Sequence, residues 1–200
     1  MSALTETRPS SVLPTDLTIA AFFEWLEGQP RRFELVDGAP QMQPFVKRSH
    51  SRIVGNLDHM LQTQIDRSAF LVHQGDFAIQ TGPRSIRYAD IMVEPAGGPP
   101  GGRTTDSAVL IVEVLSESTA PEDFGPKRVE YQALKALQTY LVVDQETPRI
   151  WQWDRGYDGK WSAHATIVTA GAVKVAALAC DLPLDEIYFG IPSAANNSQD

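Results

Sequence analysis

The apolar positions along the chain predict three helices separated by short strands. Apolar residues recur at helical spacing within residues 15–27, 49–64 and 123–137, a pattern that an amphipathic helix buries on one face. Thr15 or Asp16 is expected to cap the first helix. Short runs rich in Val, Ile, Leu and aromatic residues predict strands. These runs lie at 32–36, 39–43, 70–73, 76–80, 86–94, 108–115, 139–143, 149–154, 161–167 and 173–176.

The dipeptide Asp37-Gly38 predicts a tight hairpin between the strands at 32–36 and 39–43, because it readily adopts the positive φ values of such a turn. Helices and strands then follow one another without a regular strand–helix–strand repeat. The chain is therefore expected to form an α/β fold of the α+β type, with a mixed sheet flanked by helices.

The composition predicts a cytoplasmic protein with one domain. Of 200 residues, 42% are hydrophobic, which suffices for one core at 15–190, with a disordered N-terminal tail at 1–14 and a flexible C-terminal tail at 191–200. Cys180 is the only cysteine, so no internal disulfide is expected and a reducing cytoplasm fits. No stretch approaches the roughly 18 apolar residues of a membrane span, and residues 1–11 lack the apolar segment of a signal peptide.

The net charge of -8 weighs against strong non-specific binding to nucleic acid, since such binding depends on clustered Lys and Arg. It leaves room for a local basic face. Five basic residues near the N-terminus either form such a face or belong to an ordinary surface of mixed charge. They are Arg31, Arg32, Lys47, Arg48 and Arg52.

Glu113 is the residue whose surroundings most need explanation. It is the one charged residue in the apolar run 108–115, a pattern typical of a strand buried on both faces. A buried carboxylate is costly unless it is paired, hydrogen-bonded or bound to a metal. Two interpretations stay open, a salt bridge to Arg87, Arg128 or Lys127, and a metal ligand.

Asp90 is the second acid expected near Glu113. The strands at 86–94 and 108–115 are predicted to form an antiparallel hairpin. Asp90 then pairs near Ile111, two residues from Glu113, and residues two apart on a strand share a face. Two carboxylates would converge on one site, and oxygen ligands of this kind suit Mg²⁺ or Mn²⁺.

Lys127 is a candidate cation for the same site. It shares a helix face with Tyr131 and Leu134, which must point inward to bury their apolar surface, so Lys127 is expected to point toward the sheet. Phosphodiester hydrolysis needs cations to offset the charge on the phosphate, and it needs an activated water. A metal at Asp90 and Glu113 together with Lys127 would supply both.

These residues belong to a longer series of motifs that resembles the Uma2 family, a branch of the PD-(D/E)XK nuclease superfamily. The resemblance implies a restriction-endonuclease-like core with flanking helices and additional C-terminal strands, a divalent metal, and hydrolysis of nucleic-acid phosphodiesters, with DNA favoured. The motifs span about residues 16–188 and lie at 33–38, His50, 87–93, 111–116, Ser118, Thr119, Asp123, 127–131, 139–144 and 182–188.

The resemblance assigns the acids residue by residue. Asp90 matches the first acid of the nuclease motif and Glu113 the second, and the implied metal site comprises Asp90, Glu113 and Val114. Ala89 stands where a proline usually precedes the first acid. This departure should affect the stiffness of the backbone more than metal ligation.

A second departure concerns the catalytic lysine. Leu115 stands where the classical lysine follows the second acid, so that role would pass to Lys127. The resemblance also implies that Glu34 faces the site as a ligand or water-orienting group, although an ordinary surface strand position fits the sequence equally well. His50 either acts on the phosphate or a proton, or merely satisfies the amides of a helix start.

Two functions from different classes remain open. The first is a metal-dependent endonuclease acting on nucleic acid, and the second is a non-catalytic homodimeric binding or scaffold module that keeps the nuclease fold. Hydrolysis of some other phosphorylated molecule also fits such a fold. Aromatic residues of the late strands are interpreted as core or dimer contacts and motivate a predicted homodimer, namely Trp151, Trp153, Tyr157 and Trp161. Hydroxyl residues before the third helix are interpreted as caps, namely Ser116, Ser118 and Thr119.

Overall fold

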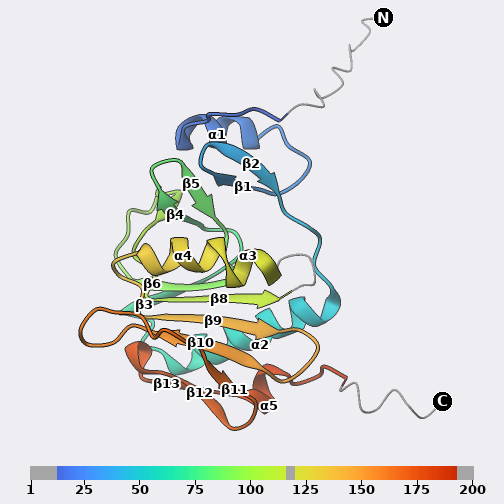
Figure 1. Ribbon diagram of the computed structural model, residues 1–200, viewed down its shortest axis with the longest axis vertical. Coiled ribbons are helices and arrows are strands. Elements are labelled where there is room, and N and C mark those ends of the chain that lie inside the picture. Colours follow the sequence, from blue (N-terminus) through green and yellow to red (C-terminus); the bar gives the residue numbers. More distant parts are fainter. Residues whose placement is uncertain (1–12, 116–119, 193–200) are drawn as a thin grey trace, which may run out of the picture.

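A mixed six-stranded sheet forms the centre of the molecule (Figure 1). The structure is a computed structural model that describes residues 13–115 and 120–192. The strand order is β11-β10-β9-β8-β6-β3, in which β8 and β9 run parallel and the other neighbours antiparallel. The inner strands are largely apolar because both faces of the sheet are covered. The strands are β3 (Phe70–Gln74), β6 (Ile91–Pro95), β8 (Leu110–Leu115), β9 (Thr139–Asp144), β10 (Ile150–Asp154) and β11 (Thr166–Val168).

A smaller five-stranded sheet lies above the central sheet in Figure 1 and packs against α1 (Ile19–Leu26). The predicted hairpin is confirmed, since Asp37 and Gly38 have φ values of 46° and 80° between β1 and β2. The helix begins later than predicted, because Thr18 caps it by accepting a hydrogen bond from the Ala21 amide. The strands are β1 (Phe33–Val36), β2 (Ala39–Met42), β4 (Ala78–Gly82), β5 (Ser85–Arg87) and β7 (Thr104–Thr105).

Helices cover both faces of the central sheet. One face packs against α2 (Arg48–Gln64), and the other against α4 (Pro126–Ala133), which follows α3 (Ala120–Phe124). The α2 face is completed by C-terminal elements, as expected from the predicted additional strands. These are β12 (Ala172–Val175), the short 3-10 helix η1 (Ala176–Leu178), β13 (Cys180–Pro183) and α5 (Leu184–Ile187).

The side chains of β8 alternate between the two faces. Val112 and Val114 join the core beneath α2, whereas Ile111 joins the core beneath α4 with Tyr131. Glu113 lies two residues from Ile111 and therefore points to the α4 side. This alternation places one charged residue of an otherwise apolar strand under the helix that carries Lys127.

The prediction of one strand over 86–94 is wrong. The segment forms two strands, β5 and β6, which belong to different sheets. Tyr88, Ala89 and Asp90 carry the chain from the five-stranded sheet to the six-stranded sheet. No glycine or proline marks this crossing, so the apolar pattern alone gave no sign of it.

The predicted register between Asp90 and the following strand is also wrong, by two residues. Ile91 pairs with Val112, and continuing the antiparallel register by one residue places Asp90 opposite Glu113 instead of Ile111. The two acids are therefore closer partners than the sequence indicated.

The predicted helix over 123–137 is too long. It breaks at Gly125 between α3 and α4 and ends at Ala133, because Leu134 has extended backbone angles. The guanidinium of Arg155 donates hydrogen bonds to the carbonyl groups of Gln132, Leu134 and Leu137. A distant side chain thus satisfies the carbonyl groups at the helix end.

The late strands also differ from the prediction. The strand expected at 161–167 is confined to β11, preceded by an isolated bridge between Arg155 and Trp161. Trp153 is buried, and Trp161 donates to the Gln132 carbonyl, so these aromatics pack within the chain, while Tyr157 is exposed. The homodimer stays a prediction.

Several expectations fall on residues outside the described ranges, namely most of both tails and the capping roles of Ser116, Ser118 and Thr119. In the part of the chain that the structure describes, no helix has the length and apolar character needed to cross a membrane.

Candidate active site

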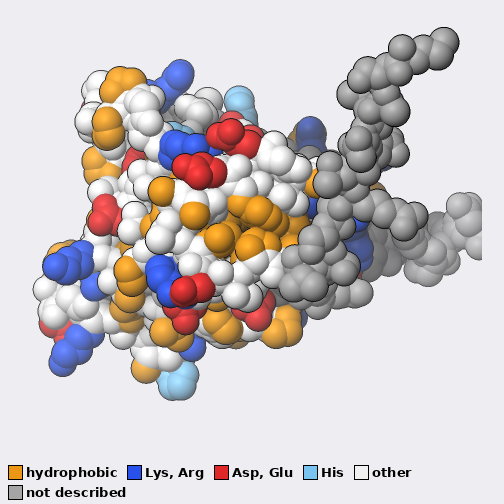
Figure 2. Space-filling model, turned by 90° about the horizontal axis from the view of Figure 1, so that it is seen from above, with side chains coloured by type: hydrophobic (Ala, Val, Ile, Leu, Met, Phe, Trp, Pro, Cys, Tyr) orange, Lys and Arg blue, Asp and Glu red, His pale blue; other side chains and the backbone are white. Residues whose placement is uncertain are grey.

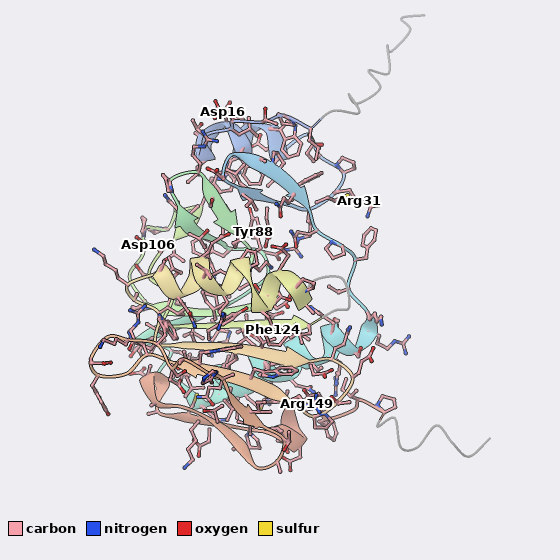
Figure 3. All side chains as sticks on the ribbon, in the orientation of Figure 1. Asp16, Arg31, Tyr88, Asp106, Phe124 and Arg149 are labelled. Atoms are coloured by element: carbon pink, nitrogen blue, oxygen red, sulfur yellow. The ribbon has the colours of Figure 1, made fainter. Side chains whose placement is uncertain are left out.

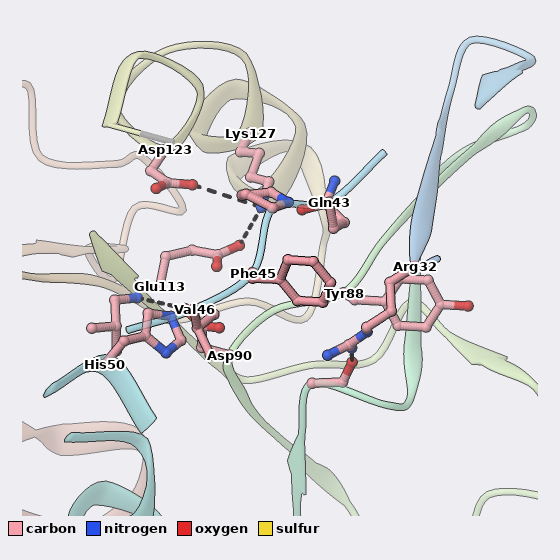
Figure 4. A pocket seen from close by; sticks show the side chains of 13 residues that line it. Arg32, Gln43, Phe45, Val46, His50, Tyr88, Asp90, Glu113, Asp123 and Lys127 are labelled. Carbon is pink, nitrogen blue, oxygen red and sulfur yellow. Dashed lines mark hydrogen bonds and ion pairs between the residues drawn. The ribbon is translucent and has the colours of Figure 1, made fainter. Parts of the chain in front are cut away.

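Asp90 and Glu113 line one pocket at the adjoining ends of β6 and β8 (Figure 4). Asp90 Oδ2 accepts a hydrogen bond from the Val114 amide at 2.7 Å and lies 3.0 Å from His50 Nε2. Glu113 Oε1 accepts from the Tyr131 hydroxyl at 2.8 Å and lies 3.2 Å from Lys127 Nζ. The structure thus brings together two acids that the sequence placed on neighbouring strands.

Lys127 is buried at the centre of a group of carboxylates. Its ammonium lies 3.2 Å from Glu113, 3.3 Å from Glu34 and 3.7 Å from Asp123. The helical pattern correctly predicted that it points toward the sheet, since Tyr131 on the same face is also buried. Of the cations proposed for a salt bridge with Glu113, Lys127 is the one that makes it.

The pocket holds more negative than positive charge. Burial raises the pKa of Glu113 well above its usual value, Lys127 opposes this shift, and Asp123, Asp90 and Glu34 add to it. Burial alone would lower the pKa of Lys127, but Glu113, Glu34 and Asp123 raise it above its usual range. Three carboxylates surround one ammonium and Asp90 adds a further negative charge near Glu113, so a further cation would relieve their repulsion.

Glu34 is buried beneath the crossing segment, so the interpretation as a surface strand residue is wrong. Only 1% of the residue is exposed. Its Oε2 accepts from the Arg87 guanidinium at 3.0 Å, and its Oε1 accepts from the Tyr88 amide at 3.1 Å. Arg87 also donates to Glu130 on α4 at 2.9 Å. This network fixes the backbone that leads to Asp90.

His50 turns toward Asp90 from the first turn of α2. It is buried, and its Nδ1 has no hydrogen-bond partner among the described residues. Its ring therefore contacts the site instead of only serving the helix start. Val114 contributes its amide to Asp90, while its side chain lies in the core on the α2 side. Roles for either residue in metal binding or catalysis stay predictions.

The acids present suit a hydrated divalent ion. Within the described residues, no three His, Cys, Asp or Glu side chains form a closed metal cage. Asp90 Oδ2 and Glu113 Oε1 are held by hydrogen bonds to other groups of the protein. The second oxygens, Asp90 Oδ1 and Glu113 Oε2, have no hydrogen-bond partner among the described residues. Mg²⁺ and Mn²⁺ keep several waters and need only one or two carboxylates. The donors thus fit such an ion.

Some members of the site were not singled out from the sequence as site residues. Asp123 is buried and lies four residues before Lys127, a helical spacing that could have indicated the pair. Arg32, Phe45 and Tyr88 line the outer part of the pocket. They come from a turn, a linking segment and the crossing between sheets. Local sequence patterns do not predict that such distant segments lie side by side.

A mixed sheet with helices on both faces and paired acids at adjoining strand ends defines a restriction-endonuclease-like protein. The model of the Uma2 family, described as "Putative restriction endonuclease", matches residues 19–182. The chain belongs to the Uma2 family.

The chain is also similar to two cyanobacterial proteins and to one solved structure. Uncharacterized protein sll1609 from Synechocystis sp. is 27% identical over 149 residues, covering 72% of this chain and 84% of the relative. Uncharacterized protein slr1290 from the same organism is 25% identical over 186 residues, covering 92% and 96%. A solved structure from Anabaena variabilis, described as a "putative nuclease belonging to DUF820", has a TM-score of 0.69 at 12% identity over 86% of this chain and 97% of that chain. This last likeness shows the fold.

Proposed function

We propose that the protein is a divalent-metal-dependent endonuclease that hydrolyses phosphodiester bonds in nucleic acid, with DNA favoured. The observation that carries the proposal is the meeting of Asp90 and Glu113 in one pocket, each with one oxygen held by the protein and the other without a hydrogen-bond partner among the described residues. Membership of a family whose model is described as "Putative restriction endonuclease" supports it.

Each residue has a distinct role in this proposal. Asp90 and Glu113 would hold Mg²⁺ or Mn²⁺, which would offset charge on the phosphate and lower the pKa of a water. Lys127 would stabilise the negative charge that develops on the phosphate. His50 and the Val114 amide hold Oδ2 of Asp90 and so orient its other oxygen.

Glu34 acts through its neighbours. It contacts Lys127 and fixes Arg87 and the Tyr88 amide, so it holds both the candidate cation and the chain before Asp90. We therefore assign it a positioning role in place of the role as ligand or water-orienting group that the family resemblance implies.

A plasmid-nicking assay tests the proposal. The wild-type protein should nick supercoiled DNA with Mg²⁺ or Mn²⁺ and stop when EDTA removes the metal. Glu113→Gln and Asp90→Asn should reduce nicking to background, because each removes the charge of one ligand. Glu24→Gln, an exposed position on α1, is the matched control and should cleave like the wild type. Equal nicking by all of these proteins would contradict the assignment.

Metal binding should strengthen as the pH rises. Burial raises the pKa of Glu113, so this group holds its proton to a higher pH than an ordinary glutamate and must release it when a metal binds. The affinity for Mn²⁺ should therefore increase with pH through that pKa and level off above it. Calorimetric titration in buffers of different ionisation enthalpy measures the released protons, and an affinity for Mn²⁺ that is independent of pH and releases no proton would contradict this expectation.

A further inference from the structure

An aromatic ring and an arginine stack at the mouth of the site. Phe45 is 82% exposed and lines the same pocket as Asp90 and Glu113. The guanidinium carbon of Arg31 lies 4.4 Å from the centre of the Phe45 ring. Arg31 lies at the edge of the molecule in Figure 3, and the exposed fraction of Phe45 shows that most of this residue remains open to solvent beside the arginine. Covering a large apolar ring that is this exposed removes apolar surface from water, so binding of a ligand to the ring is favourable.

A second hollow continues from the site past this ring. It has a volume of about 270 Å³ and is lined by the turn before β1 and the segment after β2. Arg32, Gln43, Pro44 and Phe45 line both this hollow and the pocket of the carboxylates. Phe45 is thus a shared wall, and in Figure 4 it lies between the acids and the pair Arg32 and Tyr88.

The two hollows differ in charge. The inner pocket is lined by three acids, Asp90, Glu113 and Asp123, beside the cations Lys127 and Arg32. The charged residues that line the outer hollow are both basic, Arg31 and Arg32. Arginines beside an exposed aromatic ring suit a phosphate and a base of one nucleotide, because guanidinium groups bind phosphate and bases stack on aromatic faces.

We propose that this outer hollow binds an unpaired nucleotide next to the bond that is cut, and that the substrate is therefore single-stranded or locally unpaired nucleic acid. The inference rests on the proposed nuclease function. In a duplex both faces of each base are stacked, so a base can cover Phe45 only after it is flipped out, which costs energy. The face in Figure 2 mixes basic and acidic side chains and shows no extended basic surface that could repay that cost.

Strand binding can be measured without cleavage. Fluorescence anisotropy in EDTA would compare labelled oligo-dT, oligo-U and a blunt DNA duplex of equal length. The wild-type protein should bind a single strand more tightly than the duplex, and the two single strands show whether DNA or RNA is preferred. Phe45→Ala should weaken binding of the preferred strand roughly 5- to 150-fold, the equivalent of stacking one base on an aromatic ring.

Matched variants exclude simpler causes of weaker binding. Phe45→Trp should retain binding, since its ring also stacks. Phe189→Ala removes another exposed phenylalanine that faces an arginine, Arg52, outside both hollows, and should bind like the wild type. Unchanged melting temperatures would show that all variants are folded.

Three results would overturn the inference. These are unchanged strand binding by Phe45→Ala, duplex binding as tight as single-strand binding, and no strand binding by the wild type. None of these results decides the nuclease proposal. That proposal is tested by whether the wild type nicks DNA and whether Asp90→Asn and Glu113→Gln lose this activity. Conversely, Glu113→Gln should still bind the strand, so loss of nicking with retained binding separates the two claims.

Discussion

Lys127→Met is expected to lower the free energy of unfolding by about 3–5 kcal/mol and to reduce nuclease turnover roughly 10²–10³-fold. The structural effect follows because Glu34, Glu113 and Asp123 would lose the ammonium they share while remaining buried. The catalytic effect follows because a preorganised positive charge near the phosphate would be missing. Urea unfolding measures the first effect, and single-turnover cleavage measures the second.

The two effects can be separated. Lys160→Met is the matched control, because Lys160 also pairs with an acid, Asp158 at 3.8 Å, but is exposed. Exposed pairs contribute at most about 1 kcal/mol. Mn²⁺ should stabilise Lys127→Met more than the wild type, since the ion would offset the carboxylates that have lost their partner. Full turnover by Lys127→Met at a temperature where it is folded would leave Lys127 with a structural role alone.

Arg87→Met should destabilise the protein by a similar amount, about 3–5 kcal/mol. Arg87 is 1% exposed and joins Glu34 on β1 to Glu130 on α4. Its removal would leave the fully buried Glu34 without its guanidinium partner. Because the same network holds the chain before Asp90, nuclease activity should fall as well.

A combined variant tests whether unpaired charge is the cause. Adding Glu34→Gln and Glu130→Gln to Arg87→Met removes the carboxylates that were left unpaired, so urea unfolding should show that much of the stability returns. Equal stability of Arg87→Met and the wild type would contradict the network's role. Failure of the combined variant to recover would instead indicate that lost packing dominates.

The sequence predicted the centre of the site because the signals there are local. Glu113 stood out as one acid in an apolar strand, and Lys127 shares a helix face with a tyrosine that had to be buried. Both observations depend only on the periods of strands and helices. They led to the salt bridge that the structure shows.

The rest depends on contacts between distant segments. The crossing at Tyr88–Asp90 moves the chain between sheets and shifts the register of Asp90, and no residue type marks it. The residues alone could not decide whether Glu34 is a surface residue or faces the site, because its partner Arg87 lies 53 positions away. The end of α4 is fixed by hydrogen bonds from Arg155, which follows two further strands, β9 and β10, in the sequence. Tertiary contacts of this kind override local propensity.

The alternative function, a scaffold that keeps the site only for stability, makes a different prediction about metals. In that case the buried charges would serve only to form the ion pair of Lys127 and Glu113. The protein would then have no specific affinity for a divalent ion. The proposed nuclease requires such an affinity, and it requires that the affinity depend on Asp90 and Glu113.

Calorimetric titration with Mn²⁺ tests this claim most directly. The wild-type protein and Glu24→Gln should bind one equivalent of the ion with the same affinity, whereas Asp90→Asn and Glu113→Gln should bind it much more weakly while remaining folded. Absence of binding by the wild type, or equal binding by all four proteins, would contradict the assignment of Asp90 and Glu113 as the metal site.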